Sequence, residues 1–307
     1  MQHLPVLVEE TIGFLEPGRG GLFVDCTLGL GGHAAALLAA GPSVELIGID
    51  RDPEALALAK KRLLSQGRRV RILEGNFANL EDLLAREGVE RADGILADLG
   101  VSSLQLEEAA RGFSFRREGP LDMRMGLSGP TAADIVNRYS EADLEGIFRQ
   151  YGEERKARRI ARALVERRRQ KPFATTTELR GVVERAKRAG RPVGRERIDP
   201  ATRVFQALRI EVNQELAGLR QLLDQAVRLL ERDGRLVVIS YHSLEDRLVK
   251  GTFRDLSRGE IDEVTGRPRS ESRVIEVLTR RPVRPSSAEV EANPRARSAR
   301  LRAARRL

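Results

Sequence analysis

The sequence predicts an α/β fold: a doubly wound, mostly parallel sheet with an inserted helical domain. Residues 22–50 read as strand, glycine turn, helix, strand and acid, and strand–helix alternation then continues to Asp98. The alternation stops after that point and resumes late in the chain. We therefore expect one domain to be formed by residues 1–107 and 200–307, with residues 108–199 inserted into it.

A glycine turn follows the first apolar run. It reads Gly29-Leu30-Gly31-Gly32-His33, and a helix starting near Gly32 would direct its unpaired N–H groups at the turn. Asp50 ends the next strand, where an acid can accept hydrogen bonds from both hydroxyls of a ribose. The turn and the acid together favour a nucleotide-like ligand. A purely structural turn and a relaxed dinucleotide fingerprint remain alternative interpretations at this point.

Two further strand ends carry residues suited to a ligand. Asn76-Phe77 follows an apolar strand at residues 70–73, and Asp98 ends a strand at residues 92–98. Because the carboxyl ends of parallel strands meet at one edge, we expect these residues to lie near the glycine turn. An amide and an aromatic ring suit adenine, and a methyl transferase needs a polar group after its fourth strand. These features favour S-adenosylmethionine over a dinucleotide, although Phe77 as a core aromatic and Asp98 as a turn cap are the structural alternatives.

The middle of the chain reads as ordered loops followed by helices. The loops, rich in Gly, Ser and Arg, span residues 98–125. Helices are predicted at residues 131–137, 141–151, 153–170 and 176–189. The helix at 153–170 is strongly basic, which indicates either a solvated face or a face that follows phosphates.

The alternating pattern resumes with one long predicted helix at residues 201–231 and a strand at residues 235–240. His242 and Ser243 follow that strand and open another helix; they can line a base pocket, or Ser243 can cap the helix while His242 packs. A late strand at 273–279 matches an antiparallel edge hairpin. The basic, turn-rich tail after it has a composition that favours disorder.

The composition narrows the class of protein. With 54 Lys+Arg against 45 Asp+Glu, the net charge of +9 favours a polyanionic partner. Cys26 is the single cysteine, so an internal disulfide is excluded, and with three histidines it cannot build a zinc cluster. No apolar stretch reaches the length of a membrane span, and the N-terminus lacks the form of a signal peptide. We expect a soluble cytoplasmic protein without a metal, and the oligomeric state is left open.

Several ordered motifs carry a family resemblance. They are, in chain order, HLPVL at 3–7, DCTLGLGGH at 25–33, DGILADLGVSSLQ at 93–105, RGFSF at 111–115, GPLDMRM at 119–125, YGEE at 151–154, PATRVFQALRI at 200–210, HSLEDR at 242–247 and NPRARS at 293–298. The chain resembles the bacterial small-subunit ribosomal RNA (cytosine-N4)-methyltransferase family over nearly its whole length. Tyr241 departs from the Phe more usual there, and the polar loop at 254–272 differs most.

The resemblance implies a Rossmann-like class I methyltransferase that uses S-adenosylmethionine. The acceptor that it implies is the N4 amine of a decoding-centre cytosine in 16S rRNA, within the small ribosomal subunit. The resemblance also implies that residues 108–199 recognise the substrate. The cofactor contacts that it implies are Gly31, Gly32, His33, Asp50, Phe77, Asp98 and Gln105. Candidate contacts to the substrate are Arg111, Arg124, His242, Ser243, Arg247 and the tail arginines.

The reaction itself places demands on the site. The lone pair of a cytosine amine is delocalised into the ring, so the amine is a poor nucleophile. Acceptors on its N–H groups, with the amine held in line with the methyl group, would lower the barrier. We expect Asp98, or a backbone carbonyl beside it, to supply such an acceptor in a direct displacement without a covalent intermediate. The target base must be extruded or unpaired.

Two other functions are consistent with parts of the pattern. An NAD(P)-dependent oxidoreductase can use the same fold, but no catalytic pair for hydride transfer is evident in the sequence. A non-catalytic RNA-binding or assembly factor could keep the fold as a scaffold. The combination of Asp50, Asp98 and a complete glycine turn argues against the scaffold, because a scaffold needs none of the three.

Overall fold

The computed structural model describes residues 5–188, 199–260 and 269–307. His3, part of the first motif, and residues 261–268 of the polar loop lie outside the described residues. None of the helices in the described part of the chain has the length and apolar character needed to cross a bilayer.

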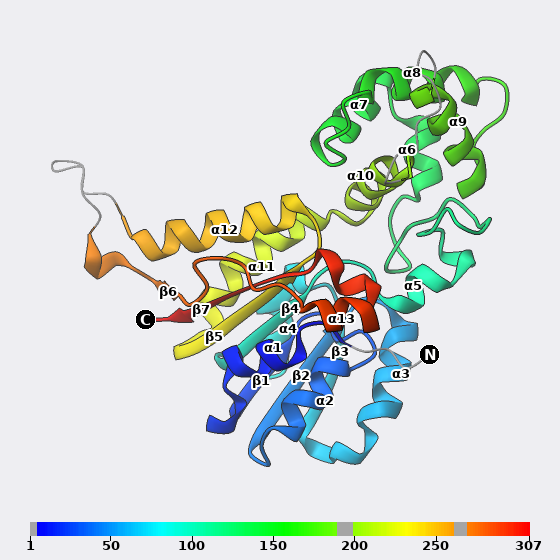
Figure 1. The fold of residues 1–307 in the computed structure, drawn as a ribbon. Coiled ribbons are helices and arrows are strands. Elements are labelled where there is room, and N and C mark those ends of the chain that lie inside the picture. Colours follow the sequence, from blue (N-terminus) through cyan, green and yellow to red (C-terminus); the bar gives the residue numbers. More distant parts are fainter. Residues whose placement is uncertain (1–4, 189–198, 261–268) are drawn as a thin grey trace. The chain divides into compact units, whose positions relative to one another are not determined.

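The chain divides into two compact units (Figure 1). The sheet unit comprises Met1–Gly100 and Leu216–Leu307, and the inserted unit comprises Val101–Glu215. Each unit has a hydrophobic core made of its own residues.

In the described residues, the sheet unit contains a seven-stranded sheet with the order β3-β2-β1-β4-β5-β7-β6. Strands β1 to β5 run parallel, and β7 runs antiparallel to both β5 and β6. The strands are β1 (Gly21–Asp25), β2 (Val44–Asp50), β3 (Val70–Glu74), β4 (Ala92–Asp98), β5 (Leu230–Ser240), β6 (Ile275–Val277) and β7 (Arg300–Arg306). This topology confirms the predicted doubly wound, mostly parallel sheet and its antiparallel edge.

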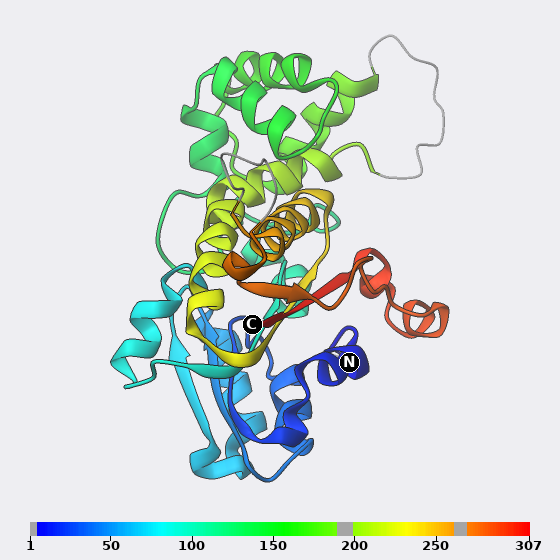
Figure 2. The same cartoon turned by 90° about the vertical axis from the view of Figure 1, so that its left-hand side faces the viewer.

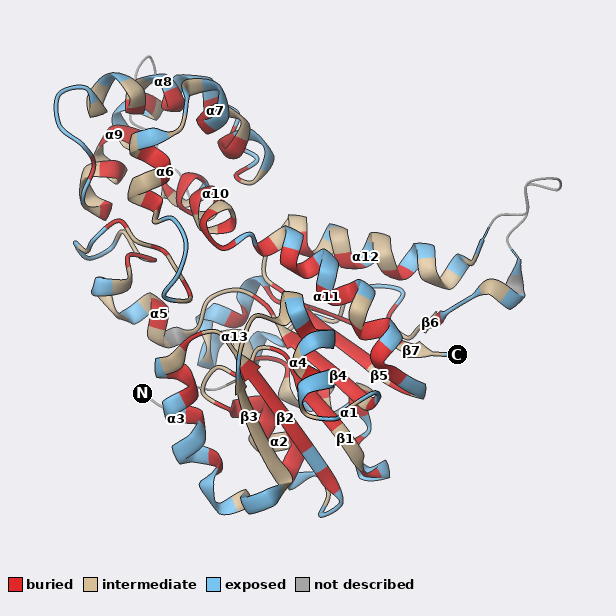
Figure 3. Cartoon of the chain, turned by 180° about the vertical axis from the view of Figure 1, so that it is seen from behind, coloured by how far each residue is buried: buried red, intermediate tan, exposed pale blue. Residues whose placement is uncertain are grey.

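Helices cover both faces of this sheet, and their buried apolar side chains form two cores (Figures 2 and 3). One face is covered by α1 (Val8–Leu15), α2 (Gly32–Ala39) and α3 (Pro53–Leu63). The other is covered by α4 (Leu80–Arg86), α11 (Glu215–Leu229) and α12 (Ser243–Arg258). Because both faces are buried, the central strands are continuous apolar runs rather than alternating patterns.

The C-terminal tail is ordered, which corrects the expectation from its composition. It forms α13 (Ser287–Ala292) and then β7, which lies between β5 and β6. Leu301, Ala303 and Ala304 are buried. Three arginines of β7 form ion pairs, for example Arg302 Nε with Asp246 Oδ1 at 2.6 Å. The arginine-rich composition therefore misled, because Arg300, Arg302 and Arg305 pair with acids, Arg306 donates to backbone carbonyls, and residues between them are apolar and buried.

The long helix predicted at 201–231 is broken in two. α10 (Thr202–Asn213) ends before Gln214, which adopts a left-handed conformation with φ 50°, and α11 follows. Two contacts hold the break: Asn213 Nδ2 donates to Met123 O at 2.7 Å, and Arg209 Nε pairs with Glu215 Oε1 at 2.8 Å. Hydrophobic periodicity cannot detect this break, because the apolar pattern runs straight through it.

The inserted unit is helical. Its helices in the described residues are α5 (Ser103–Glu107), α6 (Ala132–Arg138), α7 (Glu141–Gln150), α8 (Ala157–Arg168), α9 (Thr176–Arg188) and α10. They enclose a core that includes Ile135, Phe148, Ile160 and Leu208. The basic helix begins at residue 157 rather than 153, and Glu153 has a left-handed φ of 47°, which an α-helix cannot contain.

Candidate active site

The glycine turn connects β1 to α2 in a conformation that favours glycine. Gly29 and Gly31 have φ values of 50° and 73°, and Gly31 caps α2. A Cβ at Gly29 would find no atom outside its chain neighbours closer than 3.8 Å, so open space lies beside its backbone. A Cβ at Gly32 would meet the Pro5 ring at 3.0 Å. The turn therefore combines a packed side with an open side on which a ligand can approach the backbone.

Asp50, at the end of β2, holds this turn. One carboxylate oxygen accepts from Gly29 N at 2.7 Å and the other from Asp52 N at 3.0 Å. Burial raises the pKa of Asp50, and these two backbone hydrogen bonds oppose that rise. Each carboxylate oxygen still has a second lone pair, so the group retains the capacity to accept two ribose hydroxyls.

Asn76 and Phe77 follow β3 at the same edge of the sheet. Asn76 Oδ1 accepts from Ala78 N at 3.0 Å and so caps the short 3₁₀ helix Phe77–Asn79. Phe77 is partly buried against the core, and a Cβ at Gly218 would lie 3.4 Å from its ring. Both residues thus have a structural role, and the partial exposure of Phe77 leaves ring surface for a second one.

Asp98 ends β4 and contacts three residues near the glycine turn and β5. Its Oδ1 accepts from the Tyr241 hydroxyl at 2.8 Å, its Oδ2 lies 3.7 Å from His33 Nδ1, and its N–H donates to Thr27 Oγ1 at 2.6 Å. Its side chain is 20% exposed. Burial raises the pKa of Asp98 to about 7; the Tyr241 hydroxyl lowers it and the charge of Glu245 raises it. A carboxyl group that titrates near neutral pH is typical of functional sites.

A second acid, Asp25, lies close enough to Asp98 for their charges to interact, and it was not predicted as a site residue. It ends β1, is 1% exposed, and accepts from Thr27 N at 3.1 Å. Burial raises the pKa of Asp25 to about 6, while His33 and the Thr27 N–H lower it. Its place beside the glycine motif was the available signal, because a strand-end acid precedes the turn in the sequence.

His33 is enclosed rather than open. Its Nε2 is 2.9 Å from Val6 O and its Nδ1 faces Asp98. Burial lowers the pKa of His33, although the charge of Asp25 opposes this. Neighbouring Cys26 is buried and burial raises the pKa of its thiol well above the usual range, so it is no nucleophile at neutral pH.

The segment after β5 opens α12 with a capping box. The cap is His242, whose side chain accepts from Glu245 N, so capping does not belong to Ser243. Glu245 is 2% exposed, and its Oε2 accepts from Tyr241 N at 2.8 Å and His242 N at 3.2 Å. Arg247 lies exposed on α12. Glu245 of the HSLEDR motif thus holds the backbone of Tyr241 in position. The sequence identified Tyr241 only as a departure from the family and did not predict this contact.

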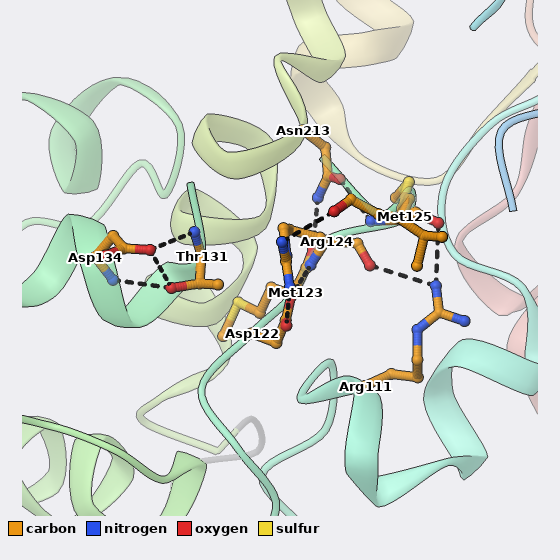
Figure 4. Close-up of polar contacts among 9 residues, drawn as sticks. Arg111, Asp122, Met123, Arg124, Met125, Thr131, Asp134 and Asn213 are labelled. Carbon is orange, nitrogen blue, oxygen red and sulfur yellow. Dashed lines mark hydrogen bonds and ion pairs between the residues drawn. The ribbon is translucent and has the colours of Figure 1, made fainter. Parts of the chain in front are cut away.

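The remaining predicted residues belong to the inserted unit. Gln105 is buried in α5, where its side chain accepts from Ser102 N at 3.0 Å. Arg111 Nη2 donates to Met125 O at 3.0 Å, and Arg124 Nη2 pairs with Asp122 Oδ2 at 2.8 Å (Figure 4). These contacts give both arginines a structural role in bracing the GPLDMRM loop. Their predicted contacts with substrate stay predictions.

A family model described as the MraW methylase family matches residues 1–307. The chain belongs to this family. The ribosomal RNA small subunit methyltransferase H of Methylobacterium sp. (strain 4-46) is 49% identical, covering 99% of this chain and 90% of that protein. The protein of the same name from Geotalea uraniireducens (strain Rf4) is also 49% identical, with 99% and 98% covered.

Family membership confirms the predicted family, the methyltransferase class and S-adenosylmethionine as the cofactor. It disfavours both the NAD(P)-dependent oxidoreductase and the non-catalytic scaffold. The site fits this cofactor: the backbone at Gly29 is approachable, Asp50 has spare lone pairs, and the Phe77 ring is partly exposed.

Proposed function

We propose that this chain transfers the methyl group of S-adenosylmethionine to the N4 amine of a cytosine in 16S rRNA. The observation that carries the chemistry is Asp98, a carboxyl group with a pKa of about 7 at the end of β4, next to the glycine turn. The substrate class is supported by the relatives, whose printed name is ribosomal RNA small subunit methyltransferase H.

The proposed cofactor contacts follow the strand ends. The backbone of the glycine turn and Asp50 would hold the ribose end of the cofactor, and Phe77 would stack on its adenine. The cofactor supplies an activated methyl group on a positively charged sulfur. Asp98 lies at the neighbouring strand end, where its negative charge favours that positive charge.

Asp98 also has the capacity to act on the cytosine amine. One oxygen accepts from Tyr241 and the other is 3.7 Å from His33, so lone pairs remain free on both for an amine N–H. Accepting that hydrogen localises the amine lone pair on nitrogen and orients it toward the methyl group. The ionised form is required for this role, so methyl transfer should increase as the pH rises through the pKa of about 7.

The inserted unit offers a surface for the RNA backbone. Exposed arginines gather on and beside α8; they are Arg155, Arg158, Arg159, Arg162 and Arg169. Such a face suits phosphates without reading sequence. We propose that the inserted unit, including this face, recognises the rRNA, within the assembled small subunit and in the cytoplasm, and that the target cytosine is extruded to reach Asp98.

Methyl transfer to small ribosomal subunits that lack the modification tests the proposed function. Labelled cofactor should place one methyl group on the N4 amine of one 16S rRNA cytosine, which mass spectrometry of RNA fragments locates. Free 16S rRNA serves as the second substrate and separates recognition of the particle from recognition of RNA alone. Label on another atom, or none with the unchanged protein on either substrate, would contradict the proposal.

A further inference from the structure

Tyr241 makes a contact with Asp98 that links two neighbouring strands. Asp98 ends β4, Tyr241 follows β5, and Asp98 pairs in register with Ile239. The Tyr241 hydroxyl donates to Asp98 Oδ1 at 2.8 Å. A phenol that donates to a carboxylate stabilises its ionised form and fixes its orientation.

Contacts of the backbone and of the ring hold Tyr241 in place. Glu245 Oε2 accepts from the Tyr241 backbone N–H at 2.8 Å and from His242 N at 3.2 Å. Gly100 lies against the ring, where a Cβ would approach it to 3.3 Å. The hydroxyl is therefore held in place by the capped start of α12 and by a glycine that follows β4.

Among the described residues, the other groups that face Asp98 do not provide a positive charge at neutral pH. His33 of α2 is 3.7 Å away, and burial lowers its pKa, so it is neutral there. Thr27 only accepts from the Asp98 backbone N–H. Asp25 of β1 and Glu245 of α12 are themselves acids. The Tyr241 hydroxyl thus supplies a neutral hydrogen bond to a carboxylate whose neighbourhood otherwise disfavours ionisation.

We propose that Tyr241 is a positioning residue that keeps Asp98 ionised and oriented for methyl transfer. This inference rests on the proposed role of Asp98. Removal of the hydroxyl takes away the hydrogen-bond donor, so the pKa of Asp98, which burial already raises to about 7, should rise further. A lost hydrogen bond to a charged group corresponds to an upward shift of about one pH unit.

Tyr241→Phe removes only the oxygen and keeps the ring against Gly100. Phenylalanine is also the residue that the family resemblance leads one to expect at this position, so the fold should tolerate it. A matched control is Tyr139→Phe in the inserted unit, where the hydroxyl donates to Glu211 Oε1 at 3.4 Å. It likewise removes a phenol bonded to a carboxyl group, but not one near Asp98.

Two measurements on the full chain test the inference. Carbon-13 NMR of labelled aspartate carboxyl groups gives the pKa of Asp98 directly, with Asp98→Asn identifying its signal. Single-turnover methylation of small subunits as a function of pH gives the acid limb of the reaction. We expect both to move upward by about one unit in Tyr241→Phe and to stay in place in Tyr139→Phe.

An unchanged pKa of Asp98 in Tyr241→Phe would overturn the inference, whatever the activity. A raised pKa with an unmoved acid limb also overturns it, because ionisation of Asp98 would then not govern methyl transfer. The NMR titration needs neither cofactor nor RNA. Failure of the inference can therefore be distinguished from failure of the proposed rRNA substrate, which appears as absent methylation with a normally shifted pKa.

Discussion

Two polar networks in this protein shift the pKa values of their carboxyl groups in opposite directions. At the end of β4, burial raises the pKa of Asp98 to about 7 and that of nearby Asp25 to about 6. In the GPLDMRM loop, burial also pushes the pKa of Asp122 upward, but hydrogen bonds from Arg124 outweigh it and hold the pKa below its usual range. In the loop, the charge of Arg124 stabilises the ionised form of Asp122. At the strand ends, burial disfavours the ionised forms of Asp98 and Asp25.

The difference indicates function, because an acid that serves only structure is normally paired. Asp122 receives two side-chain hydrogen bonds from Arg124, both 2.8 Å long (Figure 4). Asp98 receives one from a neutral phenol and has a neutral histidine at 3.7 Å. Such a site is held at a cost in stability that the rest of the fold must offset.

The largest effect is expected from replacing Asp98, the acid at the end of β4, by Asn. The amide keeps the shape but loses the charge, so single-turnover methylation should fall by about 10²- to 10⁴-fold, the usual range for a proton-accepting side chain. Rapid-quench measurement with labelled cofactor checks the rate, and calorimetric titration checks cofactor affinity separately. Full turnover in the variant would remove Asp98 from the mechanism. Asp93→Asn is a control, because Asp93 lies on the same strand but bonds Leu22 N at 2.8 Å.

The same variant should be more stable than the parent protein at alkaline pH. The folded pKa of Asp98, about 7, lies above the ordinary aspartate pKa of 3.8, so the native state binds more protons between these values and loses stability as the pH rises. Asn cannot ionise and escapes this loss, which is about 1.4 kcal/mol per pKa unit. Urea unfolding at acid and alkaline pH should show a difference only at the alkaline end. If the variant and the parent protein are equally stable at alkaline pH, the surroundings of Asp98 do not raise its pKa.

A mutation in the network that braces the GPLDMRM loop should lower the stability of the fold. Asn213 is 8% exposed, donates to Met123 O and accepts from Met125 N at 2.9 Å. Asn213→Ala leaves these buried groups without their partner, so the free energy of unfolding should fall by about 1–3 kcal/mol. Urea unfolding monitored by circular dichroism measures this. Gln150→Ala, at an exposed position at the end of α7, should change little, and equal effects would refute the bracing role.

The smallest expected effect concerns the basic face of α8. Arg158 is exposed, and its replacement by Ala should weaken RNA binding by a modest factor and reduce the salt dependence of the affinity by about one counterion or less. Fluorescence anisotropy with an rRNA fragment over a salt series measures both. Arg62→Ala, at an exposed position on α3, is the matched control. An identical salt slope in Arg158→Ala and the parent protein would exclude this position from the interface.

Much of the fold was predictable because its signals are local. The glycine turn, the strand-end acids and the apolar runs of β1, β2 and β4 each predict their own element, and parallel topology then brings Asp50 and Asp98 to one edge. The break at Gln214 was missed because long-range contacts of Asn213 create it. The order of β7 was missed because its arginines find partners far away in the sequence.

The sequence predicted where the site lies, but not the contacts that set the pKa of Asp98. Asp98 was identified from its position after a strand, which needs no knowledge of neighbours. Its contact with Tyr241 joins residues 143 positions apart, and no periodicity or motif spacing reports such a distance. Asp25 was visible in the sequence as a strand-end acid before the glycine motif, but its proximity to Asp98 follows only from the pairing of β1 with β4. Prediction from sequence therefore located the edge of the sheet that carries the site, but not the contacts that control the ionisation of Asp98.

The pairing of β4 with β5 has a consequence for how the chain folds. These neighbours, with Asp98 opposite Ile239, are separated in sequence by the entire inserted unit. Closing so long a loop has an entropic cost, which a compact insert reduces because it shortens the effective loop. The inserted unit, with its own core, would then act as a folding aid for the sheet. Destabilising it at Asn213 should slow the refolding of a sheet whose own residues are unchanged.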